Sequence, residues 1–491
     1  MTDIRAGNQM AESPLVDTYE LYIDGRWVQA HNGRYDDISP STGATIATAP
    51  DASESQVGEA IAAARRAFDQ GEWPAMSHQE RAACLTQLGE ALKAHADEFF
   101  ALAQDEWGCT ANERMMQVDS VAFMVLRAGQ LATTLREEPI GSGTTVLCHE
   151  PLGVVSILTP WNFPHSLNAM KVSRALAAGN TVVLKPSPLT PLAGLALARI
   201  IDEHTDIPPG VVNVVTPSSI EASKLLAVDP RVDMVSFTGS SAIGREVMAA
   251  AAGTMKRVLL ECGGKSASIV LDDAELTDEL LQRMLFESCL LHAGQACILH
   301  SRLLLPDTMH DDVVESLVAL ARRVKVGDPA DPDVEMGPLI SEQQRQRVED
   351  LVSRALADGA TLAIGGRRPP TLDTGYYYEP TILTHATPDA AIAQEEVFGP
   401  VLTVMRYRDD DQAVAIANNS QYGLSGAVWG TDAERAVGVA RRIRTGQIAV
   451  NGFGPGDAPF GGFKQSGLGR EGGGIAGLHQ YMEPKAIGMP A

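Results

Sequence analysis

Short, continuously apolar segments alternate with helical patterns between residues 154 and 261. The segments are VVSIL, TVVL, VVNVV, VDMVSF and RVLLE, which begin at residues 154, 181, 211, 232 and 257. Strands that are apolar on both faces and joined by helices form parallel sheets, because the helices then cover both faces. We therefore predict an α/β protein in which this stretch forms a doubly wound, Rossmann-like parallel sheet.

Helix signals occupy the gaps between these segments. Pro164 suits the first turn of one helix and Gly179 follows its expected end, while Thr190-Pro191 is typical of a cap followed by a first-turn proline. Further helices are expected near 218–227 and 241–252. Ligands of such sheets bind beyond the carboxyl ends of the strands, so the residues that directly follow each strand are the first candidates for a functional site.

A second α/β pattern extends from about residue 265 to residue 460. Its expected strands are the segments ASIVL, RLLLP, VLTVM, GAVW and IAVN, and its expected helices lie near 278–292, 308–324, 341–358, 411–419 and 432–444. The alternation of apolar strands with helices again predicts a doubly wound parallel sheet.

Smaller elements are expected around these two sheets. Asp24-Gly25 lies between two apolar pieces and indicates a β hairpin. Residues 53–107 and 112–135 have a helical period. A period-two pattern around the Gly141–Gly143 turn predicts a β ribbon that leaves the main body, and the tail MEPKAIGMP has the pattern of a strand.

Length and charge exclude several classes of protein. A chain of 491 residues is expected to form two or three units, and its net charge of -23 disfavours nucleic acid and anionic membranes as partners. No apolar run reaches the roughly 18 to 20 residues that span a bilayer, and the N-terminus does not resemble a secretory signal. The 6 cysteines lack zinc-type spacing, so we expect free thiols, no metal site and a cytoplasmic location.

Two residues with catalytic potential lie near the ends of the stretch from Leu259 to Cys297. Glu261 ends the last apolar segment of the first sheet, and Cys297 lies in GQAC, after an expected helix. A thiol with an available base can form a covalent acyl intermediate. Cys297 could instead be an ordinary buried thiol, or it could pair with His292 or His300 in a cysteine hydrolase.

Two further motifs suit a nucleotide. FTGSSAIG, residues 237–244, is a strand–turn–helix junction whose backbone amides favour a phosphate. It is not GxGxxG, and a glycine turn chosen for packing explains the spacing equally well. KPSP places Lys185 at the carboxyl end of a strand, where it could meet a ribose or phosphate, although a solvated loop lysine is the simpler explanation.

Seven motifs in order resemble those of the aldehyde dehydrogenase superfamily. They are TPWNFP, LKPSP, FTGSSAIG, LECGGKS, GQAC, EEVFGP and PFGGFKQSGLGRE, and the resemblance covers about residues 22 to 485. It implies a nucleotide-binding domain, a catalytic domain and an oligomerisation element of a homodimer or homotetramer. Their expected ranges are 1–128 with 152–263, 264–477, and 129–151 with 478–491, respectively.

The resemblance also implies catalytic roles. Cys297 would attack a small-molecule aldehyde as a thiolate, with the Asn162 side chain and the Cys297 main-chain N–H stabilising the oxyanion. Glu261 would then activate the water that hydrolyses the thioester. Lys171 and Glu471 match positions that support Glu261 and relay its proton, although both could be structural ion-pair residues. Loss of one oxyanion donor is expected to lower the rate about 100- to 1,000-fold.

The implied cofactor is NAD, with NADP possible. Lys185 and Glu396 resemble ribose contacts, with Phe398 beside Glu396, and Gly239 and Ser240 would meet the pyrophosphate. The full expected set is Pro160, Trp161, Lys185, Pro188, Phe237, Gly239, Ser240, Gly244, Gly263, Glu396 and Phe398. In the family an acidic residue often occupies the position of Pro188, where it binds the adenosine ribose of NAD and disfavours the 2′-phosphate of NADP. With proline here, NAD lacks that ribose contact, and the 2′-phosphate of NADP is no longer disfavoured by it. No added arginine lies nearby in the sequence, which favours NAD.

Two other departures concern the site itself. Cys262 follows Glu261 where the family usually has leucine, and His165-Ser166 is less apolar than the corresponding residues of many relatives. A small buried thiol at Cys262 is consistent with local packing.

Apolar residues near the expected site indicate an aliphatic, terpenoid or aromatic aldehyde. The expected pocket residues are Phe163, Leu167, Met170, Ile298 and Phe453, although the first three could be simple core residues. Relatives for acid-ended aldehydes tend to carry arginine where Met170 stands, which argues against a semialdehyde, and Arg174 keeps that possibility open.

Three further functions stay open on the sequence: a betaine-aldehyde enzyme, a CoA-acylating enzyme and a non-catalytic binding or structural relative. Glu261 argues against CoA acylation, because a thiol acceptor needs no base to activate water. A relative without catalysis is expected to lack Cys297, Asn162 or Glu261, and all three are present.

Overall fold

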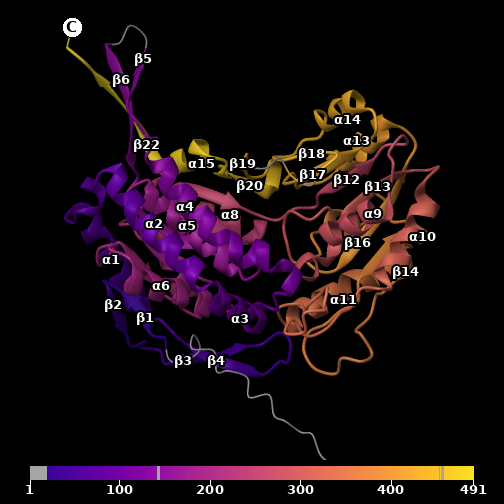
Figure 1. The fold of residues 1–491 in the computed structure, drawn as a ribbon, viewed down its shortest axis with the longest axis horizontal. Coiled ribbons are helices and arrows are strands. Elements are labelled where there is room, and N and C mark those ends of the chain that lie inside the picture. Colours follow the sequence, from indigo (N-terminus) through magenta and orange to yellow (C-terminus); the bar gives the residue numbers. More distant parts are fainter. Residues whose placement is uncertain (1–18, 141–143, 453, 455–457, 491) are drawn as a thin grey trace, which may run out of the picture.

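Two sheets, one in each half of the chain, organise the computed structural model (Figure 1). It describes residues 19–140, 144–452, 454 and 458–490. The body around the first sheet lies beside the body around the second, and a ribbon projects from the first body (Figure 1). None of the helices in the described ranges is long and apolar enough to cross a bilayer.

The first sheet contains eight strands among the described residues, in the order β2-β1-β9-β8-β7-β10-β11-β20. The strands from β9 to β11 in this order run parallel, and β1, β2 and β20 pair antiparallel at the sides. The bounds are β1 (Leu21–Ile23), β2 (Arg26–Val28), β7 (Val154–Leu158), β8 (Thr181–Lys185), β9 (Val212–Val214), β10 (Met234–Thr238), β11 (Arg257–Glu261) and β20 (Gly467–Leu468). The predicted parallel sheet is confirmed.

Alternate side chains of these strands enter two different cores. Val182 and Leu184 of β8 belong to the core shared with α5 and α6, whereas Val183 belongs to the core shared with α1, α7 and α8. Each fully buried valine or leucine stabilises the fold by roughly 1.5 to 3 kcal/mol, so both faces of the sheet must be covered. The helices of this body are α1 (Glu54–Asp69), α2 (His78–Ala94), α3 (Ala96–Trp107), α4 (Ser120–Ala132), α5 (Pro164–Ala177), α6 (Leu192–His204), α7 (Ile220–Val228) and α8 (Ser241–Ala251).

The N-terminus of α6 is not capped as predicted. The Thr190 hydroxyl has no hydrogen-bond partner among the described residues. The Glu106 carboxylate of α3 instead accepts hydrogen bonds from the backbone N–H groups of Leu192 (2.6 Å) and Ala193 (3.2 Å). A carboxylate suits this end of a helix because it satisfies free N–H groups and complements the helix dipole. The predicted Thr190 cap is therefore wrong, and the cap comes from a distant helix.

The second sheet has the strand order β14-β15-β16-β13-β12-β17-β18 in the described part of the chain. Only the β14–β15 pair among these strands is antiparallel. The strands are β12 (Ala267–Val270), β13 (Arg302–Pro306), β14 (Thr361–Ile364), β15 (Thr381–Thr384), β16 (Val401–Tyr407), β17 (Gly426–Trp429) and β18 (Ala449–Val450). One core receives α9 (Asp278–Leu285), α10 (His310–Ala321), α11 (Glu342–Ala357) and α12 (Ala391–Gln394), and the other receives α13 (Asp410–Asn418) and α14 (Ala433–Ala440).

The helix predicted over 278–292 ends earlier than expected. Regular α-helix stops at Leu285, and a wider π-helical turn covers Phe286–Leu290. His292 and Ala293 then adopt left-handed backbone angles, each with φ of 49°. The prediction of regular α-helix was wrong beyond Leu285, because the helix widens into the π-helical turn there; the chain changes direction only at His292 and Ala293, before the loop of Cys297.

Hairpins and a ribbon complete the fold. The Asp24-Gly25 hairpin is confirmed, since both residues take the positive φ of a tight turn (55° and 70°) between β1 and β2. The ribbon sheet has the order β22-β6-β5, and the predicted Gly141–Gly143 turn lies outside the described residues. The remaining bounds are β3 (Arg34–Ile38), β4 (Thr45–Pro50), β5 (Glu138–Ile140), β6 (Thr145–Pro151), β19 (Pro459–Phe460), β21 (Glu471–Gly472), α15 (Ile475–His479) and β22 (Met482–Gly488). The domain ranges and the assembly role of the ribbon stay predictions.

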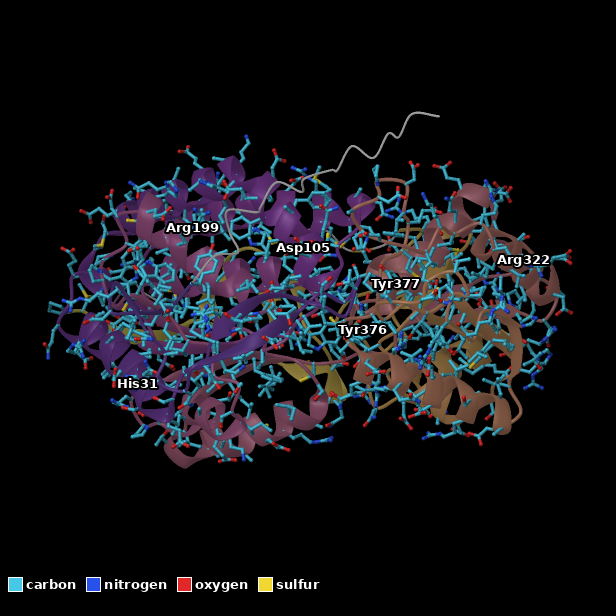
Figure 2. The ribbon with its side chains drawn as sticks, turned by 90° about the horizontal axis from the view of Figure 1, so that it is seen from below. His31, Asp105, Arg199, Arg322, Tyr376 and Tyr377 are labelled. Carbon is cyan, nitrogen blue, oxygen red and sulfur yellow. The ribbon has the colours of Figure 1, made fainter. Side chains whose placement is uncertain are left out.

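Segments from both halves of the chain meet between the two bodies. Tyr376 N donates a hydrogen bond to Pro40 O (2.9 Å), and Gln104 Nε2 donates one to Pro329 O (2.7 Å). Figure 2 places Tyr376 and Tyr377 where the purple N-terminal part meets the orange C-terminal part. These contacts help hold the two bodies together.

A buried carboxyl pair is expected to make stability depend on pH. Burial raises the pKa of Asp37 to about 7, and burial followed by the charge of Asp37 raises the pKa of Glu106. Because the folded-state pKa of Asp37 is raised, its contribution to the free energy of unfolding is fully present below about pH 4. This contribution is lost as the pH rises to about 7, by at most about 1.4 kcal/mol per pH unit. As the pH rises from 5 to 7, the melting temperature of Asp37→Asn is expected to increase relative to that of wild type. The exposed neighbour Asp36→Asn is the control, and a wild-type-to-Asp37→Asn difference that does not change with pH would contradict this account.

Candidate active site

Four parallel strands bring their following loops to one edge of the first sheet. In the strand register Leu158 stands opposite Lys185 on one side and Phe237 on the other, and Thr238 stands opposite Glu261. The motifs that follow β7, β8, β10 and β11 therefore lie together, as the sequence predicted. Parallel strands in register make this edge a natural place for a ligand.

The loop of Cys297 is held by buried polar contacts. The Glu113 carboxylate accepts the His292 backbone N–H at 2.5 Å. Gln295 is fully buried, donates to the His292 carbonyl (2.9 Å) and accepts from Ile340 N (2.9 Å). These contacts stabilise the left-handed turn at His292, which costs energy for a residue other than glycine. The nucleophile candidate thus stands on a pre-formed loop and not on a flexible one.

Asn162 reaches this loop from the end of β7. Its side-chain Nδ2 donates to the Gln295 carbonyl at 2.8 Å, and the residue is 4 % exposed. One N–H of the amide is used in this bond, so the second N–H remains available to an oxyanion near Cys297. Asn162 therefore contacts the loop that carries Cys297, and its role as an oxyanion donor stays a prediction.

The electrostatic surroundings of Cys297 favour the protonated thiol. The residue is partly exposed, yet burial of its sulfur, followed by the negative charges of Glu396 and Glu261, raises the pKa of the thiol. A thiol in such surroundings reacts only if a nearby group accepts its proton. A Cβ at Gly264, three residues after Glu261, would lie 2.5 Å from the Cys297 carbonyl oxygen, so the segment that carries Glu261 packs closely against the nucleophile loop.

Glu261 is a buried carboxyl without a hydrogen-bond partner among the described residues. Burial, followed by the charge of Glu471, raises its pKa, while the charges of Lys171 and Arg470 act in the opposite direction. A base with a raised pKa removes a proton from water more effectively than an ordinary carboxylate. The unmet hydrogen-bonding capacity of Glu261 is what a water molecule would satisfy.

Lys171 and Glu471 form a buried ion pair close to Glu261. Lys171 Nζ also donates to Ser236 Oγ (3.1 Å), and Ser236 Oγ lies 3.1 Å from the Tyr481 hydroxyl. The Tyr481 hydroxyl in turn donates to Glu471 Oε1 at 3.5 Å. This closed network orients both members of the ion pair, and the sequence reasoning missed Ser236 and Tyr481 because no motif contains them.

A cavity of about 980 Å³ opens beside the loops of the first sheet. Its lining includes Trp161 after β7, Leu189 after β8, and Gln344 and Arg347 on α11. The Trp161 and Phe398 rings meet edge to face, with centroids 5.2 Å apart. The cavity thus has an apolar wall from the first body and a polar wall from the second, which suits an elongated ligand with aromatic and hydroxyl groups.

Two side chains near this cavity carry hydrogen-bonding groups suited to a ligand. The Lys185 ammonium is buried, donates only to the Pro186 carbonyl (3.0 Å) among the described residues, and has its pKa lowered to about 8 by burial. Glu396 accepts the Gly264 N–H at 2.8 Å, and burial raises its pKa to about 7. A Cβ at Gly263 would lie 2.0 Å from Glu396 Oε2, so glycine is required for this approach.

The turn after β10 leads into α8 as predicted. Ser240 is exposed and its hydroxyl caps α8 by accepting the Ile243 N–H at 3.3 Å. A Cβ at Gly239 would lie 2.5 Å from Phe237, and one at Gly244 would lie 2.8 Å from Cys262 Sγ. Both glycines therefore permit tight packing, and the exposed N-terminus of α8 presents free backbone N–H groups.

A second cavity of about 400 Å³ lies on the other side of the nucleophile loop. Met170 and Ile298 line it, together with Met116, Leu291 and Phe460. Phe163, just before α5, packs against Leu291 and the other apolar residues of the nucleophile loop, and Leu167 of α5 is partly buried. Neither Phe163 nor Leu167 is among the residues that line this cavity. Phe453 lies outside the described residues, so its predicted place in the pocket has no structural account.

The three departures from the resemblance have local explanations. Cys262 is 5 % exposed and belongs to the core that covers one face of the first sheet, and burial raises its pKa to about 11. His165 stacks on Phe99 with ring centroids 3.9 Å apart, and burial lowers its pKa to about 3, so it is a neutral packing residue. Pro188 is partly exposed in the loop after β8.

Three supporting residues carry no motif that sequence reasoning could use. Gln344 Nε2 donates to the Phe398 carbonyl at 2.7 Å, and Arg347 Nη2 donates to the Glu396 carbonyl at 2.9 Å. Both stabilise the loop that carries the two predicted cofactor residues, as Glu113 stabilises the nucleophile loop. No group of His, Cys, Asp and Glu in the described ranges is arranged to hold a metal ion.

Comparisons with known proteins agree with this arrangement. The family model described as "Aldehyde dehydrogenase family" matches residues 27–487. The chain is 41% identical to 3-succinoylsemialdehyde-pyridine dehydrogenase of Pseudomonas sp, covering 96% of this chain and 98% of the relative, and 40% identical to betaine aldehyde dehydrogenase of Bacillus subtilis, covering 95% and 96%. The crystal structure of betaine aldehyde dehydrogenase from Staphylococcus aureus in complex with NAD+ superposes with a TM-score of 0.94 at 35% identity, covering 97% and 96% of the two chains.

Proposed function

Because the chain belongs to the aldehyde dehydrogenase family, we propose that it oxidises an aldehyde to the carboxylic acid with NAD, through a thioester on Cys297 that water hydrolyses. The observation that carries this proposal is the meeting of Asn162 with the Cys297 loop, against which the segment that carries Glu261 also packs. These three groups supply an oxyanion donor, a nucleophile and a base.

Cys297 begins the reaction in this proposal. Its partly exposed thiol first gives its proton to water, and the thiolate then adds to the aldehyde carbon. The free N–H of Asn162 together with the Cys297 backbone N–H stabilises the oxyanion of the thiohemiacetal. NAD, when bound, would accept the hydride that leaves as the oxyanion collapses. The product on the enzyme is a thioester at Cys297.

Glu261 completes the reaction. Its carboxylate takes a proton from water, which attacks the thioester carbon and releases the acid and the Cys297 thiol. The raised pKa of Glu261 makes it an effective base, and the Lys171–Glu471 pair beside it is suited to carry the proton away. A CoA-acylating enzyme would not need this buried carboxyl, so hydrolysis is favoured.

The residues at the first sheet fit NAD. Lys185 has one carbonyl partner and remaining donor capacity for ribose hydroxyls, and the exposed turn at Ser240, where α8 begins, suits a pyrophosphate. Two exposed apolar side chains, Leu189 (42% exposed) and Ile243 (46%), offer surface for a flat adenine ring. NAD is favoured over NADP because both arginines that line the cavity are already engaged, Arg347 with the Glu396 carbonyl and Arg354 with the Glu395 carboxylate.

The substrate cavity supports an aldehyde with an apolar body. Met170, Ile298, Met116 and Leu291 provide apolar surface close to Cys297. An aliphatic, terpenoid or aromatic aldehyde would bury this surface, whereas betaine aldehyde would bring a permanent cation into it. The ribbon of β5, β6 and β22 leaves paired strands outside the main body, which supports its role in a cytoplasmic homodimer or homotetramer.

NADH formation across a set of aldehydes tests the substrate and cofactor proposals. The set contains octanal, a terpenoid aldehyde, benzaldehyde, betaine aldehyde and succinic semialdehyde, each with NAD and with NADP. We expect the apolar aldehydes and NAD to give the highest kcat/KM. A preference for betaine aldehyde or for NADP would contradict the substrate or the cofactor proposal, while leaving the family membership intact.

A further inference from the structure

A buried arginine borders the substrate cavity without an acidic partner among the described residues. Arg174 is 8% exposed and lines the cavity of about 400 Å³ together with Met170 and Ile298. In the same described part of the chain its Nε has no hydrogen-bond partner, and its one side-chain hydrogen bond joins Nη1 to the Met170 carbonyl at 3.5 Å. A buried cation is unfavourable unless an anion or several acceptors meet it, so this guanidinium is suited to a charged ligand.

The other titratable groups of the cavity do not neutralise Arg174. Glu287 is already paired with Arg283, whose Nε lies 3.5 Å from Glu287 Oε1, and burial raises the Glu287 pKa to about 7. Burial lowers the pKa of His300 to about 4, so the imidazole is uncharged at neutral pH. Arg174 also lies in electrostatic range of Tyr481, whose raised pKa keeps the phenol uncharged at neutral pH. Among the described residues that line this cavity, the unmatched charge is therefore the guanidinium of Arg174.

The position of Arg174 along α5 places it one helical turn beyond Met170 in the lining of the cavity. Met170 and Arg174 are four residues apart and share one face of the helix, which separates them by about 6 Å along the helix axis, slightly more than one turn. Ile298, the residue after Cys297, lines the same cavity with both. An aldehyde group at Cys297 would thus have apolar surface beside its body and the guanidinium beyond it.

We propose that Arg174 binds a carboxylate at the far end of the substrate, and that the preferred substrates are long aldehydes with an apolar body and a terminal carboxylate. The proposal rests on the oxidation proposed above and narrows its substrate class. A guanidinium matches a carboxylate with two parallel hydrogen bonds, which a partly desolvated cavity strengthens. The cavity of about 400 Å³ has room for a body longer than that of succinic semialdehyde.

The test compares two aldehydes that differ only at the far end, nonanal and azelaic semialdehyde, with NAD as cofactor. We expect wild type to prefer azelaic semialdehyde, and Arg174→Met to lower kcat/KM for it about 10- to 100-fold while kcat/KM for nonanal changes less than about twofold. Arg174→Lys should restore part of the preference, because the charge remains without the planar fork. Arg66→Met, which removes an exposed arginine of α1 that pairs with Asp24 and does not line this cavity, is the matched control and should keep the preference.

Three results would overturn the inference. Wild type could prefer nonanal, Arg174→Met could lower both substrates equally, or the variant could change the mass of the assembly in light scattering, which would assign Arg174 to a subunit contact. Oxidation of nonanal in any of these cases leaves the proposed function in place. Absence of NADH with both aldehydes would instead contradict the proposed function itself.

Discussion

Cys297→Ala is expected to abolish aldehyde oxidation, lowering kcat by more than about 10,000-fold, because no other group on the nucleophile loop can form the thioester. NAD binding should persist, since the cavity that suits the cofactor is lined by Trp161, Leu189 and Arg347 and not by the thiol. Steady-state kinetics measures the first effect, and quenching of protein fluorescence by NAD measures the second.

Cys148→Ala is the matched control for this variant. Cys148 is a partly buried thiol in β6 of the ribbon, whose Sγ contacts the Lys485 carbonyl at 3.4 Å, far from the loops of the first sheet. It should retain wild-type activity. Loss of NAD binding in Cys297→Ala, or residual activity near that of wild type, would contradict the role assigned to Cys297.

Glu261→Gln is expected to separate the two halves of the reaction. The amide cannot accept a proton from water, so turnover should fall about 100- to 10,000-fold, the usual contribution of a general base. Cys297 and Asn162 remain, so the first turnover should still produce a burst of NADH close to one per active site. Rapid mixing with absorbance detection measures the burst, and mass spectrometry of the quenched enzyme should show the acyl group on Cys297.

Glu396→Gln is a useful comparison, because its carboxylate lies at the predicted ribose contact and not at the hydrolysis step. That variant should slow the burst itself. If Glu261→Gln shows neither burst nor acyl-enzyme, Glu261 acts before hydride transfer, for instance by accepting the proton of Cys297, whose pKa is also raised.

The sequence predicted correctly those strands, helix starts and turns that depend on residues close together in the chain. The parallel strands that end at Lys185 and Glu261 follow from continuous apolar runs, and the helix that begins at Pro164 follows from a first-turn proline. The turn at Asp24-Gly25 follows from residues that tolerate positive φ. Because these strand ends carry the motifs, the sequence also predicted where the candidate site lies.

Contacts between distant residues were not predictable in the same way. The Glu106 carboxylate caps α6 from another helix, and the Glu113 carboxylate accepts an N–H from His292, 179 positions away in the sequence. Nothing in the spacing of either glutamate marks such a partner. The early end of α9 has the same origin, since tertiary contacts override the helical period beyond Leu285.

The substrate side shows a third kind of limit. Arg174 was visible in the sequence as an argument for an acid-ended aldehyde, but only the structure shows that its guanidinium is buried beside the cavity without a carboxylate partner among the described residues. The effect of a charged residue on substrate specificity depends on whether another protein group already neutralises it, which the sequence does not show.

The measurement that tests the central claim most directly is the yield of NADH and carboxylic acid from nonanal and NAD in the absence of CoA. Hydrolysis of a Cys297 thioester predicts one NADH for each molecule of acid, with no effect of added CoA. Acid without NADH would indicate chemistry other than oxidation. A requirement for CoA would show that CoA, and not water, accepts the acyl group. No product with any aldehyde would contradict catalysis at Cys297.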